Sequence, residues 1–316
     1  MRDEPAAQWA DRREAVFIVN PTAHNRPKRG ELQQVDAWLQ EQGWRTTWQE
    51  TKAPRSAIGM AARAAENRCP LLFVCGGDGT VSEAANGLAG SETVLGVIPA
   101  GTVNLWAREA GLKLKPLKAV QAAVHGERRR IDLGRAGARY FLLMASYGAD
   151  AAVTASVSQR AKDRLGATAF ALAAAREALR YRGTRVRINA DGEEHTYRVL
   201  MLVAGNTRKY AGITSITPEA RADDGFLDLR IYRGRGTGDI LRHALATLLG
   251  RHRKSKKVSY RRVKKVTLEW EAAVPVQLDG DACAESPTEI TVAPGALCVA
   301  VPAGFTRPLF SQSPLA

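Results

Sequence analysis

The feature that most constrains the fold is a glycine-rich turn, Gly76-Gly77-Asp78-Gly79-Thr80. It follows a continuous apolar run at residues 71–75 and precedes an alanine-rich stretch at 81–88. The apolar run predicts a buried parallel strand, and the alanine-rich stretch predicts a helix. The glycines therefore lie on a strand-to-helix turn, where open α/β sheets bind ligands at the carboxyl ends of their strands.

The turn has the chemistry of a phosphate-binding loop. Glycines let phosphate oxygens approach backbone N–H groups, and the helix N-terminus adds unpaired donors. Asp78 would repel a bare phosphate, so it needs a mediator such as Mg²⁺, a sugar hydroxyl or a donor side chain. The structural alternative is a capping box, in which Thr80 caps the helix and Glu83 reaches back to it.

Composition limits the class of protein. The 316 residues suffice for one large or two ordinary domains, and the net charge of +14 favours anionic partners. The four cysteines form no C-x-x-C pair and the histidines show no metal-ligand spacing, which argues for a reducing compartment without disulfides and against zinc. Residues 1–14 lack a signal-peptide apolar region, and the apolar-rich stretch 165–175 is too short to span a bilayer. We expect a cytoplasmic protein, with peripheral contact at the inner membrane face left open.

The pattern of predicted strands and helices changes near residue 130. Up to residue 130, strands alternate with helices, which predicts a doubly wound α/β domain: strands 15–19, 44–51, 71–75 and 94–98, and helices 31–42, 56–67, 81–88, 105–110 and 116–125. Residues 131–302 are mostly strand-like and predict an antiparallel domain: strands 140–146, 184–190, 195–204, 226–232, 263–271, 274–278, 289–292 and 296–301, and helices 162–181 and 239–249. The tail, 303–316, is expected to fray or to join the first domain.

A second turn repeats the geometry of the first on the next strand. Pro99-Ala100-Gly101-Thr102 leads to Asn104 at the start of a helix, and Asn20 follows the first strand. Each alone could be an ordinary turn. Because parallel strands end at one edge of the sheet, we expect these residues to share a ligand-binding lip with Gly76.

This set of motifs resembles the diacylglycerol kinase catalytic superfamily, which also contains sphingosine and ceramide kinases. The similarity is collinear from residue 15 to residue 302. The matching segments are Asn20-Pro21, 76–80 with Glu83 and Asn86-Gly87, 99–104, 140–150, 210–229 with Asp223-Asp224-Gly225, and Asp279-Gly280-Asp281.

The resemblance implies an α/β nucleotide-binding domain followed by an antiparallel β-sandwich that takes a lipid substrate, with the active site between them. It implies transfer of the ATP γ-phosphate to a lipid hydroxyl with Mg²⁺. The nucleotide-binding residues it implies are Asn20, Thr51, Gly76, Gly77, Asp78, Gly79, Thr80, Glu83, Gly101, Thr102 and Asn104. Asp224 with the backbone of Arg221 and Phe226 would hold a structural metal, and Asp281, Asp279 and Asp78 would serve catalysis.

Three positions depart from the family pattern. Leu105 stands where many bacterial members carry Asp, which alters the arrangement around Mg²⁺. Asp281 replaces a Glu, so the proposed proton acceptor is one methylene shorter. Ala23 and His24 occupy the place of a usual glycine after Asn-Pro.

The segment 251–265 contains nine Lys or Arg residues. It is either a solvated loop or a docking surface for an anionic membrane, whereas no recognition motif favours nucleic acid. The helix 162–181 is either a core helix or a wall of the lipid pocket. Oligomeric state, a homodimer included, is left open.

The leading hypothesis is an ATP- and Mg²⁺-dependent lipid kinase acting on diacylglycerol, a sphingoid base or a related lipid. One alternative is an NAD-kinase-like enzyme that phosphorylates a small molecule, because such enzymes share the glycine turn. The other is a catalytically impaired nucleotide- or lipid-binding protein, in which Leu105 and Asp281 mark lost chemistry.

Overall fold

A computed structural model describes residues 12–156, 176, 180–210, 214–305 and 308–315. The chain forms two compact units, which are described separately. Unit 1 comprises residues 1–133, Ala222–Asp224 and 294–316, and unit 2 comprises Gly134–Arg221 and Gly225–Ala293. The functional domains that the sequence suggests, residues 1–130 and 131–302, stay a prediction.

Unit 1 is built on a parallel sheet in the order β2-β1-β3-β4-β17. The strands are β1 (Glu14–Val19), β2 (Arg45–Glu50), β3 (Leu71–Gly76), β4 (Val94–Pro99) and β17 (Glu289–Val301), of which the last begins in unit 2. The helices are α1 (Arg29–Glu41), α2 (Ser56–Glu66), α3 (Asp78–Leu88), α4 (Leu105–Glu109) and α5 (Pro116–Val124).

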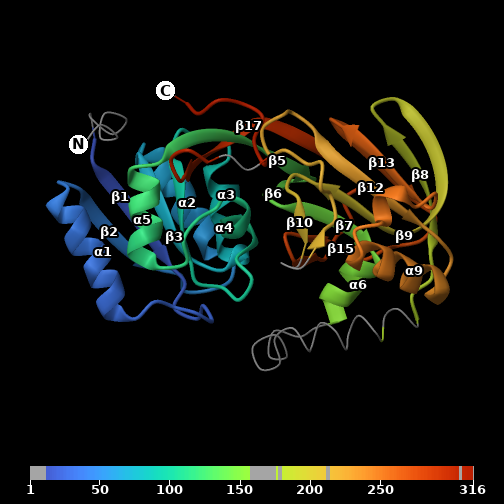
Figure 1. Cartoon of the computed structure of the whole chain (residues 1–316), viewed down its shortest axis with the longest axis horizontal. Coiled ribbons are helices and arrows are strands. Elements are labelled where there is room, and N and C mark those ends of the chain that lie inside the picture. The colour runs from blue at the N-terminus through green and yellow to red at the C-terminus, as the bar shows by residue number, and fades with distance from the viewer. Residues whose placement is uncertain (1–11, 157–175, 177–179, 211–213, 306–307, 316) are drawn as a thin grey trace. The chain divides into compact units, whose positions relative to one another are not determined.

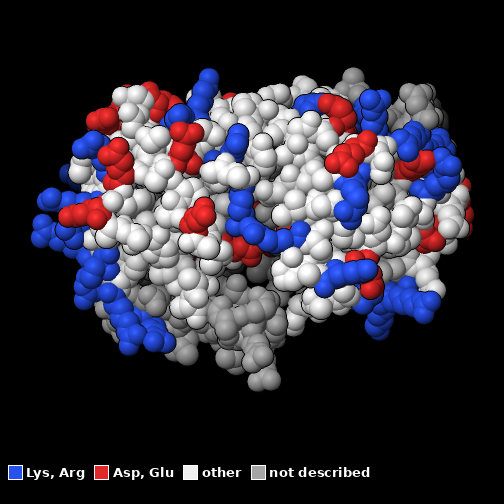
Figure 2. Space-filling view, turned by 180° about the vertical axis from the view of Figure 1, so that it is seen from behind, with Lys and Arg blue, Asp and Glu red and all other residues white. Residues whose placement is uncertain are grey.

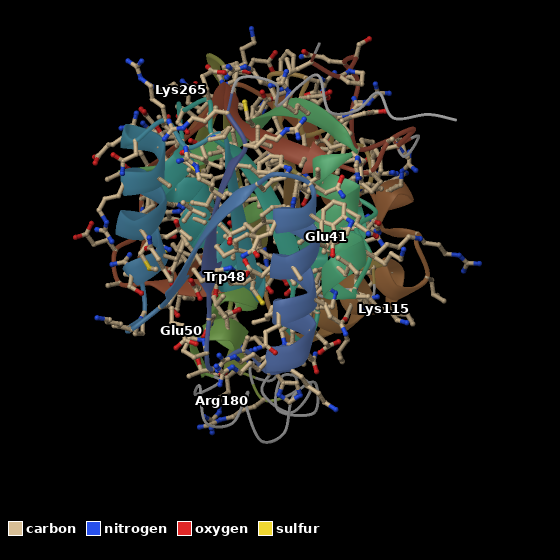
Figure 3. All side chains as sticks on the ribbon, turned by 90° about the vertical axis from the view of Figure 1, so that its left-hand side faces the viewer. Glu41, Trp48, Glu50, Lys115, Arg180 and Lys265 are labelled. Carbon is tan, nitrogen blue, oxygen red and sulfur yellow. The ribbon has the colours of Figure 1, made fainter. Side chains whose placement is uncertain are left out.

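Helices cover both faces of this sheet, so its inner strands are buried. Every residue of β3 and β4 is buried, which explains their continuous apolar sequence. Helix α1 packs beside α5, and α2 packs against α3 (Figure 1). On the outer strand β2, Trp48 stacks on Phe17, with ring centroids 3.9 Å apart, and its indole N–H donates to Asp36 of α1 (Figure 3).

Unit 2 is an antiparallel structure around a large apolar core, and a smaller apolar cluster forms around Met144, Val203, Ile216 and Tyr232. Strand β9 (Glu193–Gly205) is central: it pairs with β8 (Thr184–Ala190), β12 (Leu227–Arg233) and β7 (Met144–Gly148). The remaining elements are β5 (Glu127–Ala136, which begins in unit 1), β6 (Arg139–Phe141), α6 (Ala149–Ser156), β10 (Lys209–Tyr210), β11 (Thr214–Ser215), α9 (Thr237–Leu248), the 3₁₀ helix η2 (His252–Lys254), β13 (Val258–Val263), β14 (Lys265–Trp270), β15 (Val276–Leu278) and β16 (Asp281–Cys283).

Several predicted elements are confirmed and some are corrected. The expected strands 289–292 and 296–301 form one strand, β17, whereas 140–146 is divided into β6 and β7. Strand β5 was not predicted, because its first four residues, Glu127 and three arginines, are charged. The basic segment is not a loop, since it contains η2 and β13. The predicted helix 162–181 falls almost wholly outside the described residues.

The net positive charge of the chain is visible on its surface (Figure 2). Lys and Arg side chains are most numerous at the two lateral margins of the face drawn in Figure 2 and also occur near its middle, interspersed with Asp and Glu. Within the described ranges, no helix is long and apolar enough to cross a bilayer. All four cysteines are free thiols, and three of them are buried.

Candidate active site

The two glycine turns of unit 1 lie against each other, backbone to backbone. Strands β3 and β4 pair in parallel so that Gly76 is opposite Pro99, and both turns start at the same edge. A Cβ atom on Gly101 would lie 2.6 Å from the Cα of Gly77, so a side chain there would force the turns apart. The sequence prediction that the two turns form one lip is consistent with this geometry.

The glycines of the first turn are required for different reasons. A Cβ atom on Gly76 would lie 2.8 Å from the side chain of Thr80, and one on Gly77 would press on Gly101. A Cβ atom on Gly79, by contrast, would have no atom of another described segment within 4 Å. The fold therefore explains Gly76 and Gly77, whereas packing against the part of the chain that the structure describes gives no reason for Gly79.

Asp78 connects the first turn to helix α4. Its Oδ1 accepts the backbone N–H of Trp106 at 3.2 Å. Burial raises the pKa of the Asp78 carboxyl, and backbone N–H groups at the start of α4, those of Leu105 and Trp106 among them, partly oppose this rise. Asp78 thus stabilises the N-terminus of α4 in addition to any role it has toward Mg²⁺, which stays a prediction.

Asn104 closes the second turn. It adopts the left-handed conformation, with φ of 53°, and its Oδ1 accepts the N–H of Gly101 at 2.8 Å. Its Nδ2 donates to the carbonyl of the same glycine at 2.8 Å. Asn25, which the sequence did not single out, donates to that carbonyl from the loop after β1. Thr102 is exposed beside them.

The end of β1 also contacts the first turn. The Nδ2 of Asn20 donates to Thr80 Oγ1 at 3.1 Å, and its backbone N–H donates to the carbonyl of Cys75. Thr51, after β2, donates its N–H to the carbonyl of Val19 at 2.9 Å. Asn20, Thr51 and Thr80 therefore lie at the same edge of the sheet as the glycine turns.

Glu83 has a different structural role from the one the capping-box alternative assigns. Helix α3 begins at Asp78, with Gly77 as its N-cap, so Thr80 lies inside the first turn. The Glu83 carboxylate accepts the N–H groups of Arg55 at 2.9 Å and Ala57 at 3.2 Å, at the start of α2. The capping-box interpretation is wrong, because Glu83 caps the neighbouring helix.

In unit 2, Asp279 and Gly280 form a tight hairpin turn, and Asp281 follows it. Asp279 and Gly280 have φ of 52° and 90°, and Leu278 pairs with Asp281 across the turn. The carboxylate of Asp279 is buried and accepts the N–H groups of three successive residues: Leu142 at 2.7 Å, Leu143 at 2.8 Å and Met144 at 3.0 Å. Asp281 is exposed at the start of β16.

A buried pair of polar residues supports the same hairpin. Gln277 Nε2 donates to Asp150 Oδ2 at 3.0 Å, and Gln277 Oε1 accepts the N–H of Gly280 at 2.6 Å. Burial raises the pKa of the Asp150 carboxyl, while hydrogen bonds from Ser146 and Gln277 act in the opposite direction. Sequence reasoning noted Asp150 within a motif but missed Gln277, because a lone Gln in a short strand gives no signal.

The expected metal residues lie in the segment 221–226. Asp223 is not among them, since its carboxylate accepts the N–H groups of Ser311 and Gln312 in the C-terminal tail. Asp224 is half-buried, and with the backbone carbonyls of Arg221 and Phe226 it offers only oxygen donors. This donor set suits Mg²⁺, which is typically bound by one or two carboxylates and several waters. Among the described residues no cluster of three acidic, His or Cys side chains could hold a metal.

Two known protein families match most of the chain. The family described as the diacylglycerol kinase catalytic domain matches residues 14–136, and the YegS C-terminal NAD kinase β-sandwich-like domain matches 144–301. The chain is 30% identical over 272 residues to a diacylglycerol kinase of Staphylococcus carnosus, which covers 85% of this chain and 89% of that protein. It is 33% identical over 303 residues to a protein of Chromohalobacter salexigens named as a probable YegS-like lipid kinase, which covers 95% of this chain and 91% of that protein.

Solved structures agree with this similarity. The crystal structure of a candidate diacylglycerol kinase from Bacillus anthracis superposes with a TM-score of 0.78 at 25% identity, over 92% of this chain and 95% of that one. The predicted fold class, an α/β nucleotide-binding domain followed by a β-sandwich, is confirmed. No comparison tests the roles assigned to single residues, and these stay predictions.

Proposed function

The chain belongs to the diacylglycerol kinase catalytic-domain family, and on that premise we propose that it transfers the γ-phosphate of ATP to the hydroxyl group of a lipid. Diacylglycerol is the first acceptor to test, because several relatives carry that name. A sphingoid base or a related lipid alcohol would meet the same chemical requirement.

The observation that best supports this proposal is the open space beside Gly79. Apart from its chain neighbours and the backbone of its own helix, no atom of the described residues lies within 4 Å of where its Cβ would be, although alanine would be the better helix former at this position in the first turn of α3. The backbone N–H groups of this turn have no partner within their own helix, and the helix dipole favours an anion there. A phosphate group of ATP close to Gly79 would account for the missing side chain.

The neighbouring residues then have distinct tasks. The Gly77–Gly101 contact and the Asn104 hydrogen bonds fix the two turns, so the N–H groups are preorganised for phosphate. Asp78 keeps α4 in place through Trp106. Asn20 orients Thr80, and Thr51 and Thr102 supply hydroxyl groups at the same edge.

The second unit supplies the proton acceptor. Asp281 accepts the proton of the lipid hydroxyl, which makes the oxygen a better nucleophile. Asp279, Asp150 and Gln277 act as positioning residues that hold the hairpin turn before Asp281. Mg²⁺, when bound, would neutralise the phosphate charge that builds up during transfer.

The test is a transfer assay with the purified protein, labelled ATP and Mg²⁺. The acceptor panel contains diacylglycerol, sphingoid base, ceramide, isoprenol and NAD. We expect label in at least one lipid and its loss in Asp281→Asn. Label in NAD alone would overturn the lipid-kinase proposal. ATP binding without transfer to any acceptor would favour a non-catalytic nucleotide-binding protein.

A further inference from the structure

Helix α9 exposes a row of leucines. Leu241, Leu245 and Leu249 have exposed fractions of 59%, 59% and 56%, and their spacing of four residues places them on one face. The helix is labelled at the lower right of Figure 1. Leu249 is the C-cap residue of α9, directly after its last residue, Leu248. Surface helices normally turn such residues toward the core.

The orientation of α9 is fixed from its other side. His243 is buried, its Nε2 lies 2.9 Å from the carbonyl oxygen of Arg233, and its ring packs edge-on against Tyr232 with centroids 5.3 Å apart. A rotation that buried the leucines would withdraw His243 from these contacts. The exposed row is therefore part of the folded arrangement.

The leucine row is concentrated on this one element. Among the described residues six large apolar side chains are exposed, and three of them belong to this row. The others are Leu114, Tyr260 and Leu315, which come from separate segments. A gathering of this kind marks a surface that contacts something apolar.

Basic residues flank the leucines. Arg242 on the helix and Arg251, Arg253, Lys256 and Lys257 just after it are exposed. The acidic residue of the helix, Asp239, forms ion pairs with Arg242 and Lys257. The surface thus combines an apolar ridge with a basic border.

We propose that α9 and the segment 249–257 form a docking surface for an anionic lipid bilayer. The three leucines enter the boundary between headgroups and acyl chains, and the basic side chains contact anionic headgroups. The proposal rests on the function proposed above only for its activity readout, because vesicle binding can be measured without catalysis.

A second copy of the chain fits this surface less well. In a two-fold symmetric dimer the face would meet itself, so the arginines and lysines beside the leucines would face their own copies. Three leucine side chains also expose far less than the ~800 Å² that each partner buries in a standard interface. Charge and area both favour the bilayer.

The surface differs from the docking segment that the basic sequence 251–265 suggests. From residue 258 onward the basic side chains have partners in unit 2: Arg261 pairs with Glu193, Lys265 pairs with Glu289, and Arg262 and Lys264 lie over Phe226. Arg253 and Lys257 in the first half also form ion pairs, with Glu219 and Asp239, but this half follows α9 directly. The proposed surface therefore combines the leucine row with residues 249–257 only.

The experiment measures flotation of the purified chain with vesicles of phosphatidylcholine, with and without phosphatidylglycerol. The variant carries L241S, L245S and L249S. We expect anionic vesicles to bind the native chain, and the triple variant to bind at least about tenfold more weakly. R251Q with K256Q should also weaken binding, and should reduce its dependence on salt. L114S is the matched control, since Leu114 is a comparably exposed leucine (54%) of unit 1.

A second measurement places the helix in the bilayer directly. Leu245→Cys in a Cys283→Ser background is labelled with a polarity-sensitive dye, because the other three cysteines are buried. We expect a blue shift with anionic vesicles, and no shift for the dye on Leu114→Cys. Undiminished flotation of the triple variant, or an unshifted Leu245→Cys dye, would overturn the proposal. So would a leucine-dependent dimer in light scattering without vesicle binding.

Activity separates this proposal from the preceding one. The triple variant should lose transfer to long-chain lipid in vesicles while keeping transfer to a short-chain acceptor in detergent. Absence of transfer to every acceptor would overturn the kinase proposal, and the flotation result would still decide the docking surface.

Discussion

Gly77 and Gly101 are in backbone contact: a Cβ atom on Gly101 would lie 2.6 Å from the Cα of Gly77. We therefore predict that Gly101→Ala separates the two turns. It should lower the free energy of unfolding by about 1–3 kcal/mol and weaken ATP binding. Urea unfolding and calorimetric ATP titration measure the two effects. Gly30→Ala is the control, since a Cβ atom there would meet no atom of another described segment within 4 Å. Native-like ATP affinity of Gly101→Ala would show that the contact does not shape the site.

Gly79 allows the opposite test. Because its Cβ would point into open space within helix α3, Gly79→Ala should raise the free energy of unfolding by about 0.5–1 kcal/mol. The same methyl group should obstruct a phosphate, so the affinity for ATP should fall. The free energy of unfolding is thus expected to rise while the affinity for ATP falls. If Gly79→Ala is more stable and binds ATP like the native chain, no phosphate lies against Gly79.

Asp78 combines a structural role with a proposed catalytic one. Asp78→Asn keeps an oxygen that can accept the Trp106 N–H and removes the negative charge, whereas Asp78→Ala removes both. We expect both variants to lose transfer. Only Asp78→Ala should lose stability, by about 1 kcal/mol, as other lost helix caps do. Transfer by Asp78→Asn at the native rate would exclude a role for the charge in catalysis.

The sequence predicted the elements whose signals are local. The strands and helices predicted up to residue 125 agree with the observed bounds within one or two residues, apart from α3, which starts three residues earlier. The collinear motifs indicated the edge of the sheet where Asn20, Gly77 and Gly101 gather. These patterns depend on backbone and burial, which the residue types report directly.

What the sequence could not show depends on tertiary partners. Glu83 matches a capping box in sequence, but the N–H groups it accepts belong to Arg55 and Ala57, on another helix. Asp279 resembles a catalytic acid, yet three backbone N–H groups from residues 142–144 bind it. The exposure of Leu241 likewise depends on which side of α9 packs against the rest of unit 2.

Substitutions of the two aspartates of the β15–β16 hairpin should affect different properties: stability for Asp279 and the rate of transfer for Asp281. Asp279→Ala leaves the three buried N–H groups of residues 142–144 without an acceptor, and should cost about 1–3 kcal/mol of stability or more. Asp281→Ala, at an exposed position, should leave stability within about 0.5 kcal/mol and lower kcat by about 10²–10⁴-fold. Thermal unfolding and the transfer assay distinguish them. Full activity of Asp281→Ala would remove it as the proton acceptor.

Asp150 should make stability depend on pH. Burial raises the pKa of its carboxyl in the folded state, so folding favours the protonated form. The stability it contributes is therefore complete below the pKa of the unfolded chain and is lost as pH rises through the raised value. Asp150→Asn stays neutral and can still accept the Gln277 amide. Relative to the native chain, Asp150→Asn should thus gain stability as the pH rises from about 4 toward neutrality, measured as urea midpoints across that range. A constant difference between the two proteins over this range would mean that Asp150 titrates alike in the folded and unfolded states.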